Sequence, residues 1–530
     1  MTEQQIIQVM RAGQWSPVEI TLHAGRDHPN PYTDVSVHAD FTGPHGEVIR
    51  RPAFWDGGRV WRVQFAPPTR TGRWTWHSVC SDTSDGGLDG QRGALVSGPS
   101  AEPRPLLRAG PLRMSPGHRS VVHSDGAPFF LAGDTAWSLP WRATPDAAAA
   151  YAEDRRRKGF NCVLLMSVQP DCGARGPRDR QAVGGFDVGF EDLPDGHLNR
   201  MNVEYFQSLD RLVSILLDHG IVPIYQPVFQ GYGWKGLETL GSHAVPEEYA
   251  RFCRYLVARY GARPAIWLVS ADGDGMAPCV EAGGKEFQAW DAYHQPVGIH
   301  YNPFDQGHHN RSHQAADWLD FQWCQTGHDG KDINKVSEMS DNVPVKGVAN
   351  AEPTYEGIAD PARAAGWWQG NEAWTNLTSG GTMGVFYGAA ALWQWKITAD
   401  ELGWPAWALD HNSWKDALTK EGSRYVGFVS KALAGFDYAD MTKHPELAGG
   451  KLCAAKPPVF YCVYLPDGGD VTLSGLINPL PCFWFNPRTG ETGSAGRVTV
   501  PDCTLTAPDE RPWVLLAGVK TRPKAPGKSR

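Results

Sequence analysis

The chain has 530 residues, of which 41% are hydrophobic and 20% are charged, and its formal net charge is −8. A chain of this length is too long for one ordinary hydrophobic core, so we expect a globular protein of about two to four domains. The negative charge argues against nucleic acid or an anionic membrane as the main partner.

The first 108 residues are predicted to form an N-terminal β-sandwich. Short β-rich segments with partial alternation of apolar and polar residues are separated there by turn residues. These segments are residues 15–24, 32–43, 59–67 and 72–81. A stretch rich in Pro, Gly and Ser follows at residues 97–112, and we place the end of the first domain within it, at residue 108.

Residues 109–438 change to an alternation of strands and helices. Apolar strands are predicted at residues 128–134, 161–167, 221–227, 264–272, 296–302, 319–325, 343–352 and 383–388. Helices are predicted at residues 144–159, 202–220, 246–261, 361–379 and 414–433. Thr144 is placed to cap the first of these helices, with Pro145 in its first turn and Gly159 at its end.

The predicted strands determine the expected class of fold. Near-continuous apolar strands indicate burial on both faces and therefore a parallel sheet. Eight such strands with helices between them predict an α/β fold, the (β/α)₈ TIM barrel. A doubly wound sheet is the alternative, but no glycine-rich phosphate loop follows the first strand. The long loop at residues 168–200, after the second strand, has a length typical of functional or mobile loops.

After the barrel, the pattern returns to short strands. Residues 439–522 are predicted to form a C-terminal β-sandwich, and residues 523–530 a disordered tail. The β-rich segments are residues 457–466, 470–476, 482–491, 497–502 and 512–519.

Two acidic residues stand where predicted barrel strands end. Asp272 ends the fourth strand and Glu352 ends the seventh, which places them on opposite sides of the barrel mouth, where TIM barrels have their active sites. Glycoside hydrolysis needs two carboxyl groups that flank the scissile bond, so the pair predicts this chemistry. Asp274 is an alternative to Asp272, and capping of a helix is the structural alternative for each.

Other polar and aromatic residues near the strand ends are candidates for binding substrate. The chain has 22 tryptophans, whose flat rings and single N–H donor suit sugar rings but also suit a protein core. The candidates are Asp134, Trp137, Gln226, Trp234, Asp274, His300, Asn302, His328, Tyr355, Tyr387, Trp393 and Trp395. For Asp134 a structural role is the alternative.

Neither the cysteines nor the histidines favour a metal site. The ten cysteines include no pair spaced as CxxC. His308, His309 and His313 cluster in one segment and are possible metal ligands, but we interpret that segment as a polar loop. No metal or organic cofactor is expected.

Several motifs resemble one known family. Residues 126–137 (GAPFFLAGDTAW) resemble the opening of the apiosidase-like glycoside hydrolase domain, and further matching segments follow in the family's usual order. These are residues 259–274, 316–328, 350–357 and 379–395. Residues 52–76 resemble the β-sandwich that precedes this barrel, and residues 482–493 with 512–518 resemble a small C-terminal β-domain often described as collagen-binding.

The resemblance implies a retaining mechanism and assigns roles to the two carboxylates. Asp272 matches the family's acid/base and Glu352 its nucleophile, with His328 and Tyr355 placed to orient Glu352. The family's strand-4 motif reads Gly-Gly-Asp, whereas this chain has Ser270 and Ala271 before Asp272, so Asp274 stays an alternative. Retention requires the two carboxyl groups to lie about 5–5.5 Å apart.

The sequence therefore predicts a glycosidase acting on a plant- or bacterial-derived oligosaccharide or glycoside. Its expected partner is a carbohydrate, with no nucleic acid and no membrane. The alternatives are a non-catalytic carbohydrate-binding protein and a polysaccharide lyase or metal-dependent hydrolase. We expect a soluble, cytoplasmic protein because no signal-peptide pattern or transmembrane run is found, although a secreted chain whose signal has been removed would look the same.

Overall fold

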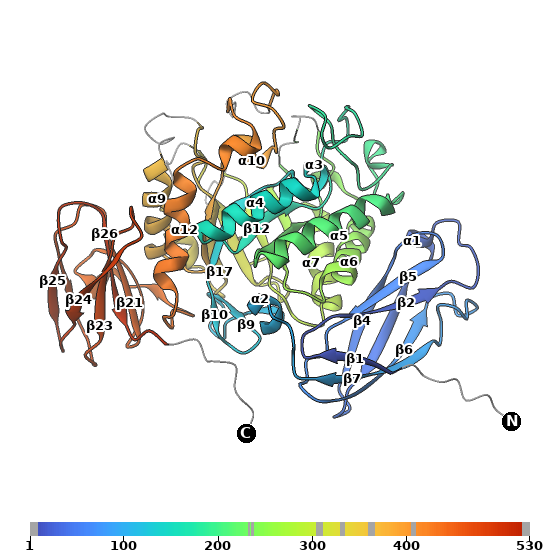
Figure 1. Cartoon of the computed structure of the whole chain (residues 1–530), viewed down its shortest axis with the longest axis horizontal. Coiled ribbons are helices and arrows are strands. Elements are labelled where there is room, and N and C mark those ends of the chain that lie inside the picture. Colours follow the sequence, from blue (N-terminus) through green and yellow to red (C-terminus); the bar gives the residue numbers. More distant parts are fainter. Residues whose placement is uncertain are drawn as a thin grey trace.

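The computed structural model describes residues 9–231, 234, 238–303, 311–328, 334–358, 366–403 and 410–521 (Figure 1). An N-terminal β-sheet, a closed parallel barrel and C-terminal β-sheets follow one another along the chain. Figure 1 shows the N-terminal sheet beside α6 and the C-terminal sheets beside α9 and α12, on opposite sides of the barrel. The predicted fold class, a TIM barrel between two β-rich parts, is confirmed.

The N-terminal part is a seven-stranded sheet in the order β1-β7-β6-β3-β4-β5-β2. Alternating side chains bury one face, where Phe41 stacks on Phe65 with ring centroids 4.0 Å apart and Trp74 packs beside them. The strands are β1 (Val9–Gly13), β2 (Val18–His23), β3 (Val37–Thr42), β4 (Val48–Trp55), β5 (Val60–Phe65), β6 (Gly72–Cys80) and β7 (Arg92–Gly98), with the short helix α1 (Pro31–Asp34) before β3.

A connecting region leads from this sheet to the barrel. It contains α2 (Pro105–Ala109) and a three-stranded sheet of β8 (Leu112–Met114), β9 (Val121–His123) and β10 (Pro128–Phe129). The predicted boundary at residue 108 falls within α2, and the predicted boundary at residue 438 falls between α12 and β19.

The barrel is closed by parallel pairing of its first strand with its last, Asp134 opposite Tyr387. Its strands are β11 (Leu131–Thr135), β12 (Cys162–Met166), β13 (Val222–Gln226), β14 (Ile266–Gly273), β15 (Val297–Tyr301), β16 (Phe321–Gln325), β17 (Gly347–Glu352) and β18 (Gly384–Tyr387). Strand β17 begins later than the predicted residue 343, since Pro344 has no N–H to donate to a neighbouring strand.

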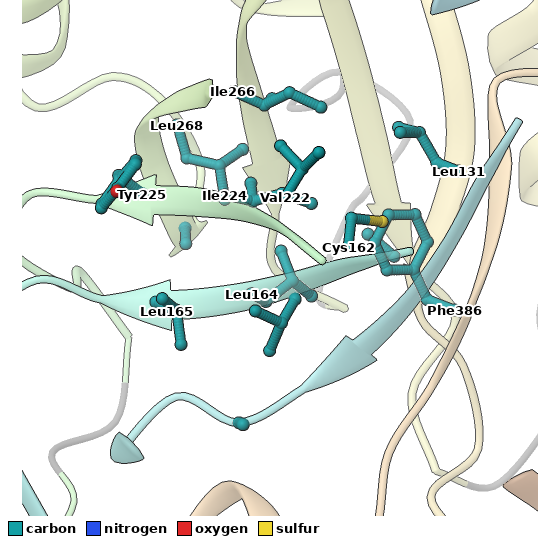
Figure 2. Packing of buried hydrophobic residues seen from close by; sticks show 14 of the residues in the cluster. Leu131, Cys162, Leu164, Leu165, Val222, Ile224, Tyr225, Ile266, Leu268 and Phe386 are labelled. Carbon is teal, nitrogen blue, oxygen red and sulfur yellow. The ribbon is translucent and has the colours of Figure 1, made fainter. Parts of the chain in front are cut away.

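Apolar side chains from these strands fill the barrel core. Figure 2 shows residues of β11, β12, β13, β14 and β18 packed together, among them Leu131, Cys162 and Phe386. Gly133 is required at its position, because a Cβ there would lie 2.2 Å from the ring of Phe386. The buried strands explain why the sequence reads as apolar runs rather than as alternation.

The predicted helices are present around the barrel, together with α3, α7, α8 and α10, which were not predicted. In chain order, the helices are α3 (Leu139–Arg142), α4 (Pro145–Lys158), α5 (Val203–Asp218), α6 (Pro246–Tyr260), α7 (Pro278–Trp290), α8 (Lys335–Ser340), α9 (Gly366–Thr378), α10 (Ala390–Trp393), α11 (Trp414–Ala417) and α12 (Gly422–Leu433). Thr144 caps α4 by accepting the N–H of Ala147 at 3.3 Å, and Gly159 ends the helix with φ of 107°. The predicted residues 361–365 of the α9 segment lie outside the described residues.

One predicted helix is wrong, because the structure has two helices in its place. Residues 414–433 form two helices, α11 and α12, separated by a short turn. The Ser413 side chain and Asp416 form a capping box at the start of α11. The N–H of Gly422 donates to Oε2 of the buried Glu356 at 2.9 Å, a tertiary contact that starts α12 separately.

The C-terminal part contains a six-stranded sheet in the order β19-β20-β21-β26-β23-β24 and the separate pair β22–β25. It packs on α9, where the Tyr464 hydroxyl donates to the Asn371 side chain at 2.6 Å. The strands are β19 (Thr442–Lys443), β20 (Leu452–Lys456), β21 (Phe460–Leu465), β22 (Asp470–Leu473), β23 (Pro481–Phe485), β24 (Thr492–Arg497), β25 (Cys503–Thr506) and β26 (Trp513–Gly518). The predicted disordered tail, residues 523–530, lies outside the described residues. Among the helices that are described, none has the length and apolar character needed to span a membrane.

Candidate active site

Glu352 is the last residue of β17, and its side chain lies between two imidazoles. Its carboxylate oxygens are 3.7 Å from Nε2 of His300 and 3.5 Å from Nε2 of His328. Burial by itself raises the pKa of Glu352, but the hydrogen bond from His328 and the charges of both histidines outweigh burial and hold the pKa below its ordinary value. Glu352 is therefore ionised at neutral pH.

His328 is oriented by the backbone of Tyr355. The Tyr355 N–H donates to Nδ1 of His328 at 3.3 Å, and the two rings lie 4.3 Å apart between centroids. Because an amide N–H can only donate, Nδ1 is an acceptor and the proton of the neutral imidazole lies on Nε2. This tautomer presents an N–H donor toward Glu352.

Asp272 lies in an irregular part of β14. Its φ is 58°, in the left-handed region, and the pairing with β15 shifts register between Ala271 and Gly273. Such bulges change the direction of a side chain at the rim of a barrel, and a non-glycine residue is held in this backbone region only by the structure around it. Gly231 makes room for it, since a Cβ there would lie 2.0 Å from the Asp272 carboxylate.

Tyr355 connects the two carboxylates electrostatically. Burial raises the pKa of Tyr355 well above its ordinary value, and the negative charges of Glu352 and Asp272 both add to that rise. Both members of the predicted pair therefore act electrostatically on one phenol.

Asp274 serves a local turn instead. Its Oδ1 accepts the N–H of Met276 at 2.8 Å, and its carbonyl accepts the Ser312 hydroxyl at 3.0 Å. This arrangement is the ordinary turn-forming use of an aspartate.

A buried network behind Glu352 was not identified from the sequence. Asn350 donates to the Thr326 hydroxyl, which donates to Glu372 on α9 at 3.1 Å. Glu372 also accepts the Thr354 N–H at 3.1 Å, so one carboxylate holds residues on both sides of Glu352. Burial raises the pKa of Glu372 despite these hydrogen bonds. The feature of the sequence that points to this network is Glu372 itself, an acid among the apolar residues of a predicted helix.

Several candidate substrate-binding residues make contacts within the protein fold. Asp134 accepts from Tyr151 at 2.9 Å and pairs with Arg155, both on α4. The Tyr387 hydroxyl donates to Glu356 at 2.7 Å.

Gln226 and Trp395 are also enclosed by protein. The Gln226 amide donates to the Val228 carbonyl at 2.7 Å, and Trp395 is fully buried and stacks on Trp414 at 4.8 Å. These contacts favour structural roles for both residues.

The remaining candidates are placed nearer the mouth. The ring centroids of Trp137 and His300 are 6.0 Å apart, while the Asn302 backbone N–H donates to the Gly273 carbonyl at 3.0 Å. Trp393 is buried on α10, which follows β18.

Trp234 lines a cavity of about 460 Å³ with residues that follow β11, β12 and β18. Arg142 lies over its ring at 4.6 Å and pairs with Glu401 at 2.6 Å. The cavity is thus part of the rim formed by the loops at the carboxyl ends of the strands.

Of the histidine cluster, His308 and His309 lie outside the described residues. His313 contacts the Gly275 carbonyl at 3.0 Å and packs against Trp318. In the described ranges, no three His, Cys, Asp or Glu side chains form a group suited to a metal ion.

Together these features define a class of protein. A closed parallel barrel with acidic side chains at the ends of its fourth and seventh strands has the architecture of glycoside hydrolases. The chain belongs to the apiosidase-like family, since the model of its catalytic domain matches residues 115–440. Residues 11–81 match a domain of unknown function, DUF5060.

Solved structures share the fold. A putative glycoside hydrolase from Bacteroides vulgatus has a TM-score of 0.71 and 16% identity, covering 96% of this chain and 99% of its own. A glycoside hydrolase family 5 protein from the same species has a TM-score of 0.65 and 19% identity, covering 78% and 93%. A search of curated proteins finds no match. The fold and family support glycosidase activity in general and a carbohydrate as substrate.

Proposed function

We propose that this protein is a retaining glycosidase in which Glu352 is the nucleophile and Asp272 the acid/base. The observation that carries the proposal is the state of Glu352, which is ionised and held between two imidazoles at the end of β17. A carboxylate in this state suits attack on an anomeric carbon. Asp272, on β14, supplies the second carboxyl group that the reaction needs.

The proposed reaction has two steps. Asp272 donates a proton to the glycosidic oxygen while Glu352 attacks the anomeric carbon, so the bond to the leaving alcohol breaks and a glycosyl ester forms. Asp272, now a carboxylate, takes a proton from water, whose oxygen attacks the same carbon and releases Glu352. His328 and Tyr355 position Glu352, and Trp137 and Trp234 are proposed to contact the sugar.

We propose a plant- or bacterial-derived oligosaccharide or glycoside as substrate. All ten cysteines are free and most are buried, which favours a reducing compartment and supports a cytoplasmic location. In that location a small glycoside is a more suitable substrate than a polymer.

The test is a screen of aryl glycosides and oligosaccharides with wild type, Glu352→Gln, Asp272→Asn and Asp274→Asn. We expect Glu352→Gln to lower kcat/KM by about 10³-fold or more and Asp272→Asn by about 10²–10⁴-fold, with the smaller loss on substrates that have acidic leaving groups. Asp274→Asn is the matched control and should stay within a few-fold of wild type. The first sugar released should keep its anomeric configuration when followed by NMR.

Other results would redirect the proposal. Equal losses of kcat/KM in Asp272→Asn and Asp274→Asn would leave the acid/base unassigned between the two residues. Inversion of the anomeric configuration would make Glu352 a general base. An unsaturated product that absorbs in the ultraviolet would indicate a lyase, while binding without turnover by wild type would indicate a carbohydrate-binding protein.

A further inference from the structure

A second cavity lies between the N-terminal sheet and α6, away from Glu352 and Asp272. Its volume is about 350 Å³, within the usual range for sites that bind small molecules. The N-terminal part supplies most of its aromatic wall, and α6 supplies its basic side. The residues that matter here are Tyr32, Phe54, Trp55, Trp61, Arg251 and Arg254.

Two polar groups of this wall lack a hydrogen-bond partner. The Tyr32 hydroxyl and the Trp61 indole N–H are buried without one, in side chains that are only 5% and 3% exposed. Buried polar groups almost always have partners, so each such group needs an explanation. Both side chains line the same cavity, and a small shift of each ring on binding would bring its unpartnered group to a hydroxyl of the ligand.

Trp55 provides a fixed flat surface in the same cavity. Its indole N–H donates to the Gly58 carbonyl at 2.9 Å, which holds the ring while leaving it half-buried. An aromatic face held in this way presents apolar area at low cost in conformational entropy.

The basic side of the cavity retains donor capacity. Arg251 donates to the neutral Asn199 amide oxygen at 2.8 Å, whereas Arg254 pairs with Glu286 and lies over Trp290. A guanidinium has five N–H donors, so Arg251 has further donors for hydroxyl or carboxylate oxygens of a ligand.

We propose that this cavity is a second sugar-binding site that holds one unit of a glycan and takes no part in bond cleavage. A sugar ring has an apolar face for Trp55, hydroxyls for Tyr32 and Trp61, and oxygens for Arg251. The cavity itself is independent of the proposed glycosidase function, but the choice of a sugar as ligand rests on it.

The position of the cavity indicates how a second site would serve the enzyme. Helix α6 follows β13, so its first turns lie toward the carboxyl ends of the strands, where the candidate active site is. The cavity is lined by residues from Glu247 to Tyr255 of this helix. A glycan held there would be retained near the barrel mouth without touching the two carboxylates.

The experiment is calorimetric titration of cellotriose, xylotriose, mannotriose and trigalacturonic acid into the Glu352→Gln chain, which avoids hydrolysis. We expect at least one of these probes to bind, and Trp55→Ala in the same background to weaken that binding by about tenfold or more. Trp55→Phe keeps the flat ring and should retain most of the affinity. Trp367→Ala is the matched control, since Trp367 is, like Trp55, a half-buried tryptophan, but it does not line this cavity.

The outcomes separate this proposal from the catalytic one. Preference for trigalacturonic acid, reduced by Arg251→Gln, would identify carboxylate recognition, and preference for a neutral trisaccharide would identify stacking on Trp55. Hydrolysis of a small aryl glycoside by the otherwise wild-type Trp55→Ala chain should be unchanged. The proposal is overturned if none of the four probes binds, or if Trp55→Ala, shown to be folded by circular dichroism, binds them as the parent does.

Discussion

At the residue scale, the protonation of Glu352 is controlled by its neighbours rather than by its position in the sequence. Burial favours the neutral acid, while His328 and His300 favour the carboxylate and prevail. Burial also lowers the pKa of His300, and the charge of Glu352 opposes that shift. The two imidazoles are held in different ways. The Tyr355 backbone N–H fixes His328, whereas His300 is enclosed in the barrel.

The first prediction concerns the pH dependence of activity. In His328→Ala, Glu352 loses the hydrogen bond from His328, so burial should raise its pKa. Since catalysis needs the carboxylate, the acidic limb of the kcat/KM profile should move to higher pH. The measurement is the pH profile of aryl glycoside hydrolysis.

A histidine outside the site provides the control. His77 is exposed on β6, and His77→Ala should leave the profile unchanged. An unchanged acidic limb in His328→Ala would show that His328 does not hold Glu352 in its ionised state.

At the element scale, buried charges connect strands to the helices that cover them. Asp134 on β11 pairs with Arg155 on α4, and neither side chain is exposed. The sequence placed Asp134 correctly at a strand end, but the direction of its side chain depends on α4. That direction favours the structural alternative for this residue.

The second prediction follows from this ion pair. Asp134→Ala leaves Arg155 buried with Asp154 as its one charged partner in the described part of the chain, so we expect a loss of about 3 kcal/mol in the free energy of unfolding. Asp154→Ala, whose carboxylate is nearer the surface, should cost less. Urea denaturation measures both, and a KM unchanged at low temperature would distinguish a structural from a substrate-binding role.

The third prediction concerns the other end of the barrel. Asp320, just before β16, accepts the Val297 N–H at 3.0 Å, and burial raises its pKa to about 6 against the hydrogen bond and Lys346. Below the unfolded pKa of about 4 both states are protonated, and between about 4 and 6 only the folded state keeps the proton. Asp320 therefore lowers stability as pH rises through this window.

The variant Asp320→Asn should remove this contribution. We expect its Tm to exceed that of wild type by a few degrees above pH 6 and to approach it near pH 4. Calorimetry across this range is the measurement. A difference in Tm that is the same at every pH would show that ionisation of Asp320 is not its source.

At the scale of the whole molecule, the N-terminal sheet is joined to the barrel by buried arginines. Arg51 of β4 donates to the Val257 carbonyl of α6 at 3.0 Å, and its guanidinium lies over the Tyr293 ring. From the other side, Arg259 of α6 pairs with Asp56 at 3.0 Å. The cavity proposed to bind a sugar lies along the same junction.

The fourth prediction tests that junction. Arg51→Ala should lower the free energy of unfolding by about 2–3 kcal/mol, because it removes the buried hydrogen bonds from Arg51 to the Gln64 and Val257 carbonyls and the packing against Tyr293. Activity on a small aryl glycoside should stay near that of wild type. The exposed Arg73→Ala on β6 is the control, and equal stabilities of the two variants would show that the junction contributes little.

Much of this architecture was determined by the sequence alone. The apolar runs predicted eight barrel strands because strands buried on both faces cannot alternate, and Thr144 with Gly159 marked the ends of α4. Asp272 and Glu352 were predicted as a pair because the topology of a TIM barrel brings the carboxyl ends of its strands to one mouth, and both lie at the ends of their strands. Local chemistry and a known topology were sufficient for these features.

Only the tertiary structure decided which way side chains point and what surrounds them. Asp134 and Tyr387 end barrel strands as predicted, yet they contact Arg155 and Glu356 instead of the mouth. The tautomer of His328, the support from Glu372 and the cavity beside Trp55 depend on residues far apart in the chain. A sequence pattern specifies the period of a strand, but the environment of each side chain arises from long-range packing.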